Sequence, residues 1–326
     1  MAAVQHIRLA YNNVYAVSEG PETALVDTGP DYRGAFETLL GELRNRLPAV
    51  VVATHGHPDH AGLGAAWLRR GVPVLLDSND RHFSRAQGLA DPAEFALLEQ
   101  FVRASGAPAG VQDDAMAALR RRRVANQLAA EDYPPPGRPP HWPTGLRFEP
   151  FVPSPGEPGG APFPAGLRIL PAPGHTPGNV VLTHEAEGWL FSGDTLLPEI
   201  TPTPAIQGDP ANPGTRLRSL PAFVESLKVL AAGAYTRCFP GHGEPFDDVA
   251  EAIRLNLDAI DQRTARVRDE LRTGGPSTPW GLSERIYPRA VHRRFWQIVP
   301  TILGHLDILE EVGEVTFAGG DYSING

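Results

Sequence analysis

Three histidines and one aspartate share six consecutive positions of this chain, and this motif restricts its fold and chemistry more than any other feature. The motif reads His55-Gly56-His57-Pro58-Asp59-His60 and follows Thr54 and the apolar residues 50–53. An apolar run of this length is typical of a buried strand, which places the motif on a turn from a strand into a helix. Neutral imidazoles with a carboxylate suit zinc or another borderline transition metal. Because the chain has 11 histidines among 326 residues, chance explains the cluster poorly.

Later strand-like runs also stop at glycine or proline beside a residue that can bind a metal. The residues are His175 after 167–170, Asp194 after 189–192 and His242 after 236–239. A single loop histidine is usually only solvated. Strand ends of one sheet, however, can bring distant residues to a common edge. With the first motif, the sequence therefore offers seven candidate ligands.

In this order, the seven residues resemble the complete ligand set of the metallo-β-lactamase-fold hydrolases. Asp27, in Thr23-Ala24-Leu25-Val26-Asp27-Thr28-Gly29, matches the acidic residue that this family often carries before the metal motif. The resemblance covers roughly residues 5–80 and 165–270. Its ordered motifs are specific for fold and metal, whereas they do not identify the substrate.

The resemblance implies an α/β (α+β) fold, the four-layer αββα metallo-β-lactamase sandwich. We expect a catalytic domain at residues 1–272 that carries a helical and Pro-rich insertion at about 80–165. Residues 273–326 would form a small C-terminal domain of helices followed by a hairpin. That order resembles the winged-helix tail of the family branch that includes the β-lactamase-like protein 2 hydrolases. We expect the insertion to serve substrate selection.

The resemblance also implies a role for each candidate residue. His55, His57 and His175 would bind a first metal, Asp59, His60 and His242 a second, and Asp194 would bridge the two. Asp59 and Asp194 would take catalytic roles, with Asp59 orienting the attacking hydroxide. Asp27 would support a ligand histidine rather than bind metal.

Two Zn²⁺ ions are the expected cofactors, although iron or manganese would also fit these donors. His57 stands where the related flavodiiron oxygen reductases usually carry a glutamate. An all-nitrogen first site favours zinc hydrolysis over di-iron redox chemistry. The persulfide dioxygenases of the same superfamily use one iron with a similar motif, so they remain an alternative.

The function that fits best is a dinuclear zinc hydrolase in which metal-bound hydroxide cleaves a small carboxylic ester, thioester or lactone. The main alternative is a phosphodiesterase acting on RNA or single-stranded DNA, for which the tail offers a basic cluster of Arg285, Arg289, Arg293 and Arg294. The small-molecule substrate ranks first because the net charge is −9 and the insertion is rich in proline. A homodimer through the insertion or the tail is a further expectation.

The chain has no basic and apolar leader after Met1 and no stretch of about 20 apolar residues. Cys238 has no second cysteine to pair with and is expected to be a core residue rather than a nucleophile. We therefore expect a cytoplasmic protein with no membrane partner.

Apolar periodicity and turn residues predict the local elements. Strands are expected at residues 4–9, 14–17, 24–26, 50–53, 72–76, 167–170, 189–192 and 236–239, with a hairpin at 314–317 and 321–324. Helices are expected at residues 32–47, 61–70, 92–104, 111–132, 216–231, 251–271, 277–288 and 291–309. From Tyr133 to Pro164, frequent prolines argue against regular structure.

Overall fold

The computed structural model describes residues 1–80, 92–132, 164–198 and 205–325, with side chains except at 122–132 and 164. Almost all of the Pro-rich segment from Tyr133 to Pro164 lies outside these residues, and so do residues 81–91 and 199–204. All helices and strands named below lie within these residues.

The first half of the chain builds a five-stranded sheet with the strand order β1-β2-β3-β4-β5. Its strands are β1 (Ala3–Leu9), β2 (Asn12–Glu19), β3 (Glu22–Val26), β4 (Val50–Val52) and β5 (Val74–Leu75). The first three strands are antiparallel, whereas β3, β4 and β5 run parallel. Helices α1 (Ala35–Glu42) and α3 (Gly64–Arg69) cover the outer face, where Leu39 and Trp67 are fully buried.

The second half builds a four-stranded sheet with the order β6-β7-β8-β9. Its strands are β6 (Arg168–Pro171), β7 (Val180–His184), β8 (Trp189–Gly193) and β9 (Arg237–Pro240). Helices α6 (Ser219–Ala231) and α7 (Val249–Gly274) cover its outer face through a shared apolar core. Strand β7 is the one element of this sheet that has no counterpart among the predicted strands.

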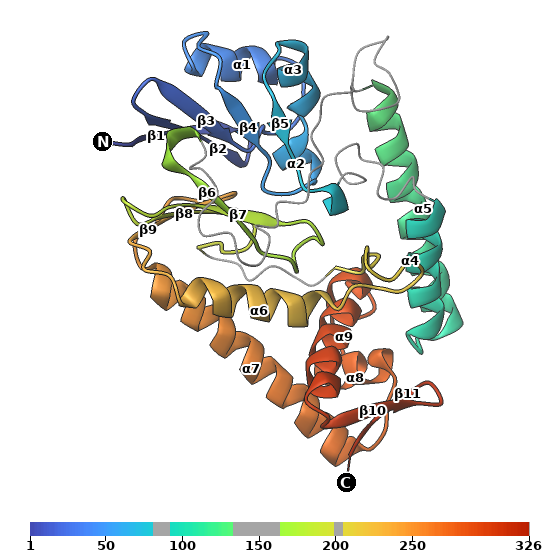
Figure 1. Cartoon of the computed structure of the whole chain (residues 1–326). Helices are drawn as coiled ribbons and strands as arrows, with labels where there is room; N and C mark the ends of the chain where they lie inside the picture. Colours follow the sequence, from blue (N-terminus) through green and yellow to red (C-terminus); the bar gives the residue numbers. More distant parts are fainter. Residues whose placement is uncertain (81–91, 133–163, 199–204, 326) are drawn as a thin grey trace.

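The inner faces of the two sheets pack on each other. Tyr15 and Val17 of the first sheet share a buried cluster with Leu182, Phe191 and Phe239 of the second. Figure 1 shows the resulting order of layers, with α1 and α3 above, the two sheets between, and α6 and α7 below. The predicted four-layer αββα sandwich is therefore confirmed.

A separate helical unit adjoins the sandwich (Figure 1). It contains α4 (Pro92–Ala104), α5 (Ala109–Asp132), α8 (Pro279–Ile286), α9 (Phe295–Glu311), β10 (Val315–Ala318) and β11 (Asp321–Ile324). Val102 and Met116 of the insertion share one core with Trp280 and Phe295 of the tail. The two helices of the insertion are thus packed against the C-terminal region. Helix, helix and hairpin occur in the expected order, while the winged-helix assignment and the boundary at 272 stay predictions.

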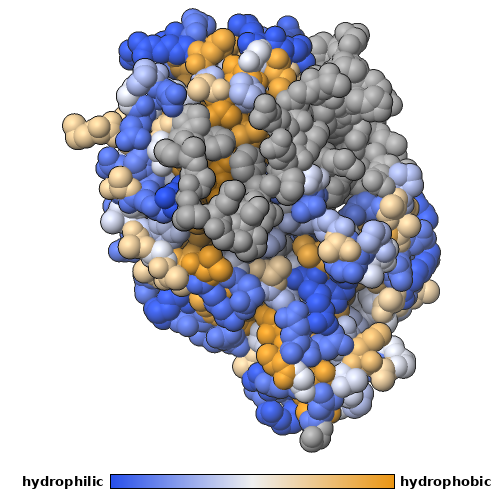
Figure 2. Space-filling view, viewed as in Figure 1, coloured by the Kyte–Doolittle hydropathy of each residue, from blue (hydrophilic) through white to orange (hydrophobic). Residues whose placement is uncertain are grey.

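The hydropathy of the surface follows the same division into elements. In Figure 2, hydrophilic residues predominate at the outer edges of this face, and apolar residues form a band in its upper middle. This distribution agrees with apolar cores that lie beneath the helices on both sides of the sandwich.

Several helices differ from their predicted bounds, and α1, the expected helix at 61–70 and α6 are examples. Helix α1 ends at Glu42, before Arg44 and Asn45, which adopt left-handed backbone angles. The expected helix at 61–70 is divided into α2 (Pro58–Ala61) and α3, because the Leu63 N–H bonds to the Thr28 hydroxyl instead of continuing the first helix. Helix α6 begins at Ser219 rather than at residue 216. Within the described ranges, no helix is both long and apolar enough to cross a membrane.

Candidate metal centre

The carboxyl ends of four strands deliver the candidate ligands to one place. Residues 55–60 follow β4, His175 follows β6, Asp194 follows β8 and His242 follows β9, while the supporting residue Asp27 follows β3. Because β3 runs parallel to β4, and β8 parallel to β9, these ends point in the same direction within each sheet. The Val180 N–H donates to the Thr54 carbonyl at 2.8 Å, which ties the motif loop to the second sheet.

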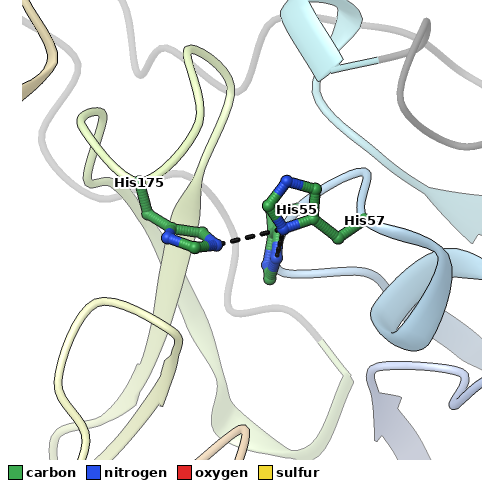
Figure 3. Close-up of side chains that lie close together, drawn as sticks. All are labelled: His55, His57 and His175. Atoms are coloured by element: carbon green, nitrogen blue, oxygen red, sulfur yellow. Dashed lines mark hydrogen bonds between the residues drawn. The ribbon is translucent and has the colours of Figure 1, made fainter. Parts of the chain in front are cut away.

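The first group of ligands consists of three imidazoles from both halves of the sandwich. His57 Nδ1 lies 3.0 Å from His55 Nε2 and 3.1 Å from His175 Nε2. Figure 3 shows the rings of the two motif histidines meeting that of His175, which comes from the turn between β6 and β7. Their nitrogen atoms lie within 4.8 Å of one another, as expected for ligands of one ion.

The second group contains a carboxylate and two imidazoles. Asp59 Oδ2 lies 3.8 Å from His60 Nε2 and 3.5 Å from His242 Nε2. These three residues offer donor atoms that also lie within 4.8 Å of one another. The side chains assigned to each of the two metals thus lie together, and a third set, His55, His60 and Asp194, overlaps both groups.

Asp194 lies between the two groups. Its Oδ2 is 3.4 Å from His175 Nε2 in the first group, and its Oδ1 is 3.3 Å from His60 Nε2 in the second. Both Asp194 Oδ1 and His60 Nε2 are buried, yet neither has a hydrogen-bond partner among the described residues. Unpartnered buried polar atoms are costly, and a cation bound between them would satisfy both. The donor set therefore fits metal ions.

Electrostatics leave the first group uncharged. Burial, followed by the neighbouring imidazole of His60, holds the pKa of His55 well below its usual range. Burial and His175 lower the pKa of His57 to about 3, and burial also lowers the pKa of His175. These rings therefore present neutral lone pairs at pH 7, the form that a metal requires.

Carboxylates reverse this effect in the second group. Burial alone would lower the pKa of His60, but the charges of Asp194 and Asp27 raise it well above its usual range. Burial is likewise outweighed at His242, where the nearby carboxylates of Asp194 and Asp59 raise the pKa to about 10. The pKa of Asp194 is held well below normal despite its burial, chiefly by the charge of His60. Without a bound metal, His60 and His242 are therefore protonated at pH 7.

Asp27 supports the second group from behind. Its Oδ2 accepts a 2.8 Å hydrogen bond from His60 Nδ1, and its Oδ1 accepts from the Thr54 N–H at 2.7 Å. The His60 ring therefore turns its Nε2 atom towards Asp194. Asp27 has a φ of 63°, which is strained for a residue with a side chain and is held by these contacts.

Asp80 is a supporting residue that the sequence analysis missed. It ends the short 3-10 helix η1 (Ser78–Asp80) and is fully buried. Its Oδ2 accepts hydrogen bonds from the Gly56 N–H at 2.9 Å and from the Thr176 hydroxyl, and its Oδ1 accepts from the Gly178 N–H at 2.6 Å. Asp80 thereby joins the loop of His55 and His57 to the loop of His175. Its place after β5, parallel to β4, was the available signal.

The turn that carries His242 is fixed by strand β2 and by a glycine. Asn13 Nδ2 donates to the Pro240 carbonyl at 2.9 Å and to the Gly243 carbonyl at 2.7 Å. A Cβ atom on Gly241 would lie 2.6 Å from His60 Cε1 and 2.7 Å from Asp194 Oδ1, so only glycine fits there. The ring of Tyr11, which is 66% exposed, stacks on His242 with centroids 5.8 Å apart.

Cys238 does not contribute to the centre. It is fully buried among the apolar residues beneath α6, and burial raises the pKa of its thiol to about 12. A thiol in this state is a poor nucleophile. The expectation of a core residue agrees with this position.

Residues 7–242 match the model of the Metallo-beta-lactamase superfamily. The chain belongs to this superfamily. The predicted resemblance is thus confirmed, and the enzyme class with it: the chain is a metal-dependent hydrolase of the superfamily. The match spans both sheets and every candidate ligand.

Three curated proteins are similar in sequence to most of this chain. A Bacillus subtilis (strain 168) protein named Probable metallo-hydrolase YqjP is 27% identical over 93% of this chain and 89% of its own length. Hydroxyacylglutathione hydrolase of Anaeromyxobacter dehalogenans (strain 2CP-C) is 33% identical over 77% of this chain and 69% of its own. The Beta-lactamase-like protein 2 homolog of Caenorhabditis elegans is 31% identical over 84% of this chain and 70% of its own.

A solved structure shares the architecture of the whole chain. The crystal structure of a metallo-beta-lactamase family protein from Thermus thermophilus superposes with a TM-score of 0.69 at 27% identity. The superposition covers 99% of this chain and 98% of that one, so the helical unit is included.

Proposed function

We propose that this chain is a dinuclear zinc hydrolase that cleaves a small carboxylic ester, thioester or lactone. The position of Asp194 carries the proposal, because one of its oxygens lies 3.4 Å from His175 of the first group and the other lies 3.3 Å from His60 of the second. A single metal would need only one group of three side chains. A carboxylate between two such groups is what a shared, two-metal centre requires.

Each ligand group would hold one ion, as assigned above, with Asp194 shared between them. Zinc bound there would lower the pKa of a water molecule towards neutrality and polarise a substrate carbonyl. Asp59 keeps 21% of its side chain exposed, so it can accept a hydrogen bond from the attacking water and orient it. Asp27 accepts the hydrogen bond from His60 Nδ1, so Nε2 is the nitrogen that faces the centre and would bind the metal once its proton is lost.

A carbonyl substrate is favoured over nucleic acid by two observations. The net charge of −9 disfavours a polyanionic substrate. Hydroxyacylglutathione hydrolase, whose name describes cleavage of a thioester, is 33% identical to this chain. A small thioester or related ester is therefore the substrate class that we propose.

The test is a comparison of initial rates on an acyl thioester, a lactone and an RNA oligonucleotide with the zinc-loaded protein. Asp194→Ala serves as the blank, and Asp269→Ala, an exposed carboxylate on α7, serves as the matched control. The proposal predicts thioester or lactone turnover that the blank loses and the control keeps. RNA cleavage with inert acyl substrates, lost in the same blank, would overturn it.

A further inference from the structure

A pocket outside the metal centre lies among α7, α8 and α9. Figure 1 shows these three helices in its lower part. Its volume is about 330 Å³, which suits a small organic molecule. The lining separates into a buried floor and an exposed rim. The floor contains Val267, Ile286, Ile302 and His305, and the rim contains Gln262, Arg263 and Arg266.

The floor offers one directed hydrogen-bond acceptor. The Thr264 hydroxyl donates its single hydrogen to the Ile260 carbonyl at 2.9 Å. Its oxygen therefore accepts from His305 Nδ1, 2.8 Å away, which places the ring proton on Nδ1. The other ring nitrogen, Nε2, then carries the lone pair. Because His305 lines the pocket, this lone pair is available to a ligand.

His305 stays neutral under ordinary conditions. It is 2% exposed, and burial lowers the pKa of its imidazole to about 4, with a further contribution from the charge of Arg263. At neutral pH the ring therefore accepts a hydrogen bond at Nε2 and donates one at Nδ1.

The rim offers positive charge that the protein itself does not neutralise. Arg263 and Arg266 lie three residues apart on α7 and therefore project to the same side. In the described part of the chain, neither guanidinium forms an ion pair. Other arginines of the same helix do: Arg254 pairs with Glu251, Arg268 with Glu314 and Arg272 with Asp269. Arg266 is also held in place, since it donates to the Ile286 carbonyl at 3.1 Å.

We propose that this pocket binds a small organic anion with a short apolar body and one hydrogen-bond donor, as in a hydroxy acid. The guanidinium groups of Arg263 and Arg266 bind the carboxylate, for which their planar fork is suited. Val267 and Ile302 contact the apolar body. The donor of the ligand meets His305 Nε2. The site is separate from the metal centre and does not depend on the reaction proposed there.

The probe is 3-hydroxybutyrate, titrated into zinc-loaded protein with ¹⁵N-labelled histidine. The readout is the Nε2 resonance of His305, assigned with His305→Asn, which keeps a donor for Thr264. Reading this atom distinguishes the pocket from carboxylate binding at the metals. We expect a saturable shift of the resonance, with a Kd at least roughly tenfold weaker in Arg263→Gln/Arg266→Gln. Arg272→Gln, on the same helix and outside the pocket, should leave the Kd unchanged.

Two related compounds test the ligand class. Butyrate lacks the hydroxyl donor, and 1,3-butanediol lacks the charge, so both should bind more weakly than 3-hydroxybutyrate. The proposal is overturned if the His305 resonance does not move at millimolar probe. It is equally overturned if Arg272→Gln weakens binding as much as the double variant, or if the diol binds as well as the acid.

Discussion

The two ligand groups of the metal centre differ in how they are kept ready for a cation. In the first group, burial leaves three neutral imidazoles with low pKa values. In the second, Asp194 and Asp27 raise the pKa of His60, and Asp194 and Asp59 raise that of His242, so both rings are protonated at pH 7 when no metal is bound. The comparison teaches that residue types alone do not determine readiness to bind metal, because the same imidazole is neutral or protonated according to its nearest carboxylate.

The two supporting carboxylates, Asp27 and Asp80, each serve one ligand group, and they do so through different contacts. Asp27 contacts His60 directly and therefore orients a single ring of the second group. Asp80 instead joins the backbone of the two loops that carry the first group. Asp27 thus supports the second group by orienting one of its ligands. Asp80 supports the first group by holding its two loops together.

Removing the shared ligand should have the largest effect, because it disturbs both halves. Asp194→Asn keeps the volume of the side chain but loses its charge. We expect kcat/KM to fall on the order of a thousandfold. Without the shared carboxylate the metals would be bound more weakly, and they would stabilise the negative charge on the substrate oxygen in the transition state less. Steady-state rates and the zinc content of the dialysed protein measure this loss. An Asp194→Asn variant that stays active with two bound zinc ions would show that Asp194 is not shared.

The next largest effect should be a difference between the two ligand groups in how their zinc affinity depends on pH. Binding zinc at the second group requires His60 and His242 to lose the protons that their raised pKa values retain at pH 7. Its affinity should therefore rise with pH, by roughly a hundredfold per pH unit where two protons are released. The first group, already neutral, should show little change above about pH 6. Calorimetric zinc titrations in buffers of different ionisation enthalpy count these protons, and equal release from both sites would contradict the comparison.

Substitution of the two supporting carboxylates should have smaller and separate effects. We expect Asp27→Asn to weaken the second zinc by about 10- to 100-fold and to spare the first. Asp80→Asn should instead weaken the first, because Gly56 and Gly178 lose a charged acceptor. Competition with a chelator gives both dissociation constants. If each variant weakened both sites equally, the supporting roles would not be divided as the hydrogen bonds suggest.

The parts of this account that were predictable from sequence are those encoded locally. Residues 55–60 follow an apolar run of valines, and glycine or proline turns mark the strand ends before His175, Asp194 and His242. The seven candidate ligands could therefore be chosen from the sequence alone. The helical stripe at 92–104 likewise gave α4 its bounds.

Features that depend on distant contacts were not predictable in this way. Asp80 acquires its role only when β5 pairs with β4, because this pairing brings its carboxylate within hydrogen-bond distance of the Gly56 N–H. Strand β7 is a different case, because its apolar run Val180-Val181-Leu182 was a signal in the sequence that the prediction overlooked. The common core of the insertion and the tail joins residues such as Met116 and Phe295, which no local pattern relates.

Anomalous diffraction from crystals of the zinc-loaded protein, recorded on both sides of the zinc edge, tests the central claim most directly. The account predicts two zinc peaks, one among His55, His57 and His175 and the other among Asp59, His60 and His242, with Asp194 contacting both. A single peak at full zinc occupancy, or a second peak away from Asp194, would contradict it.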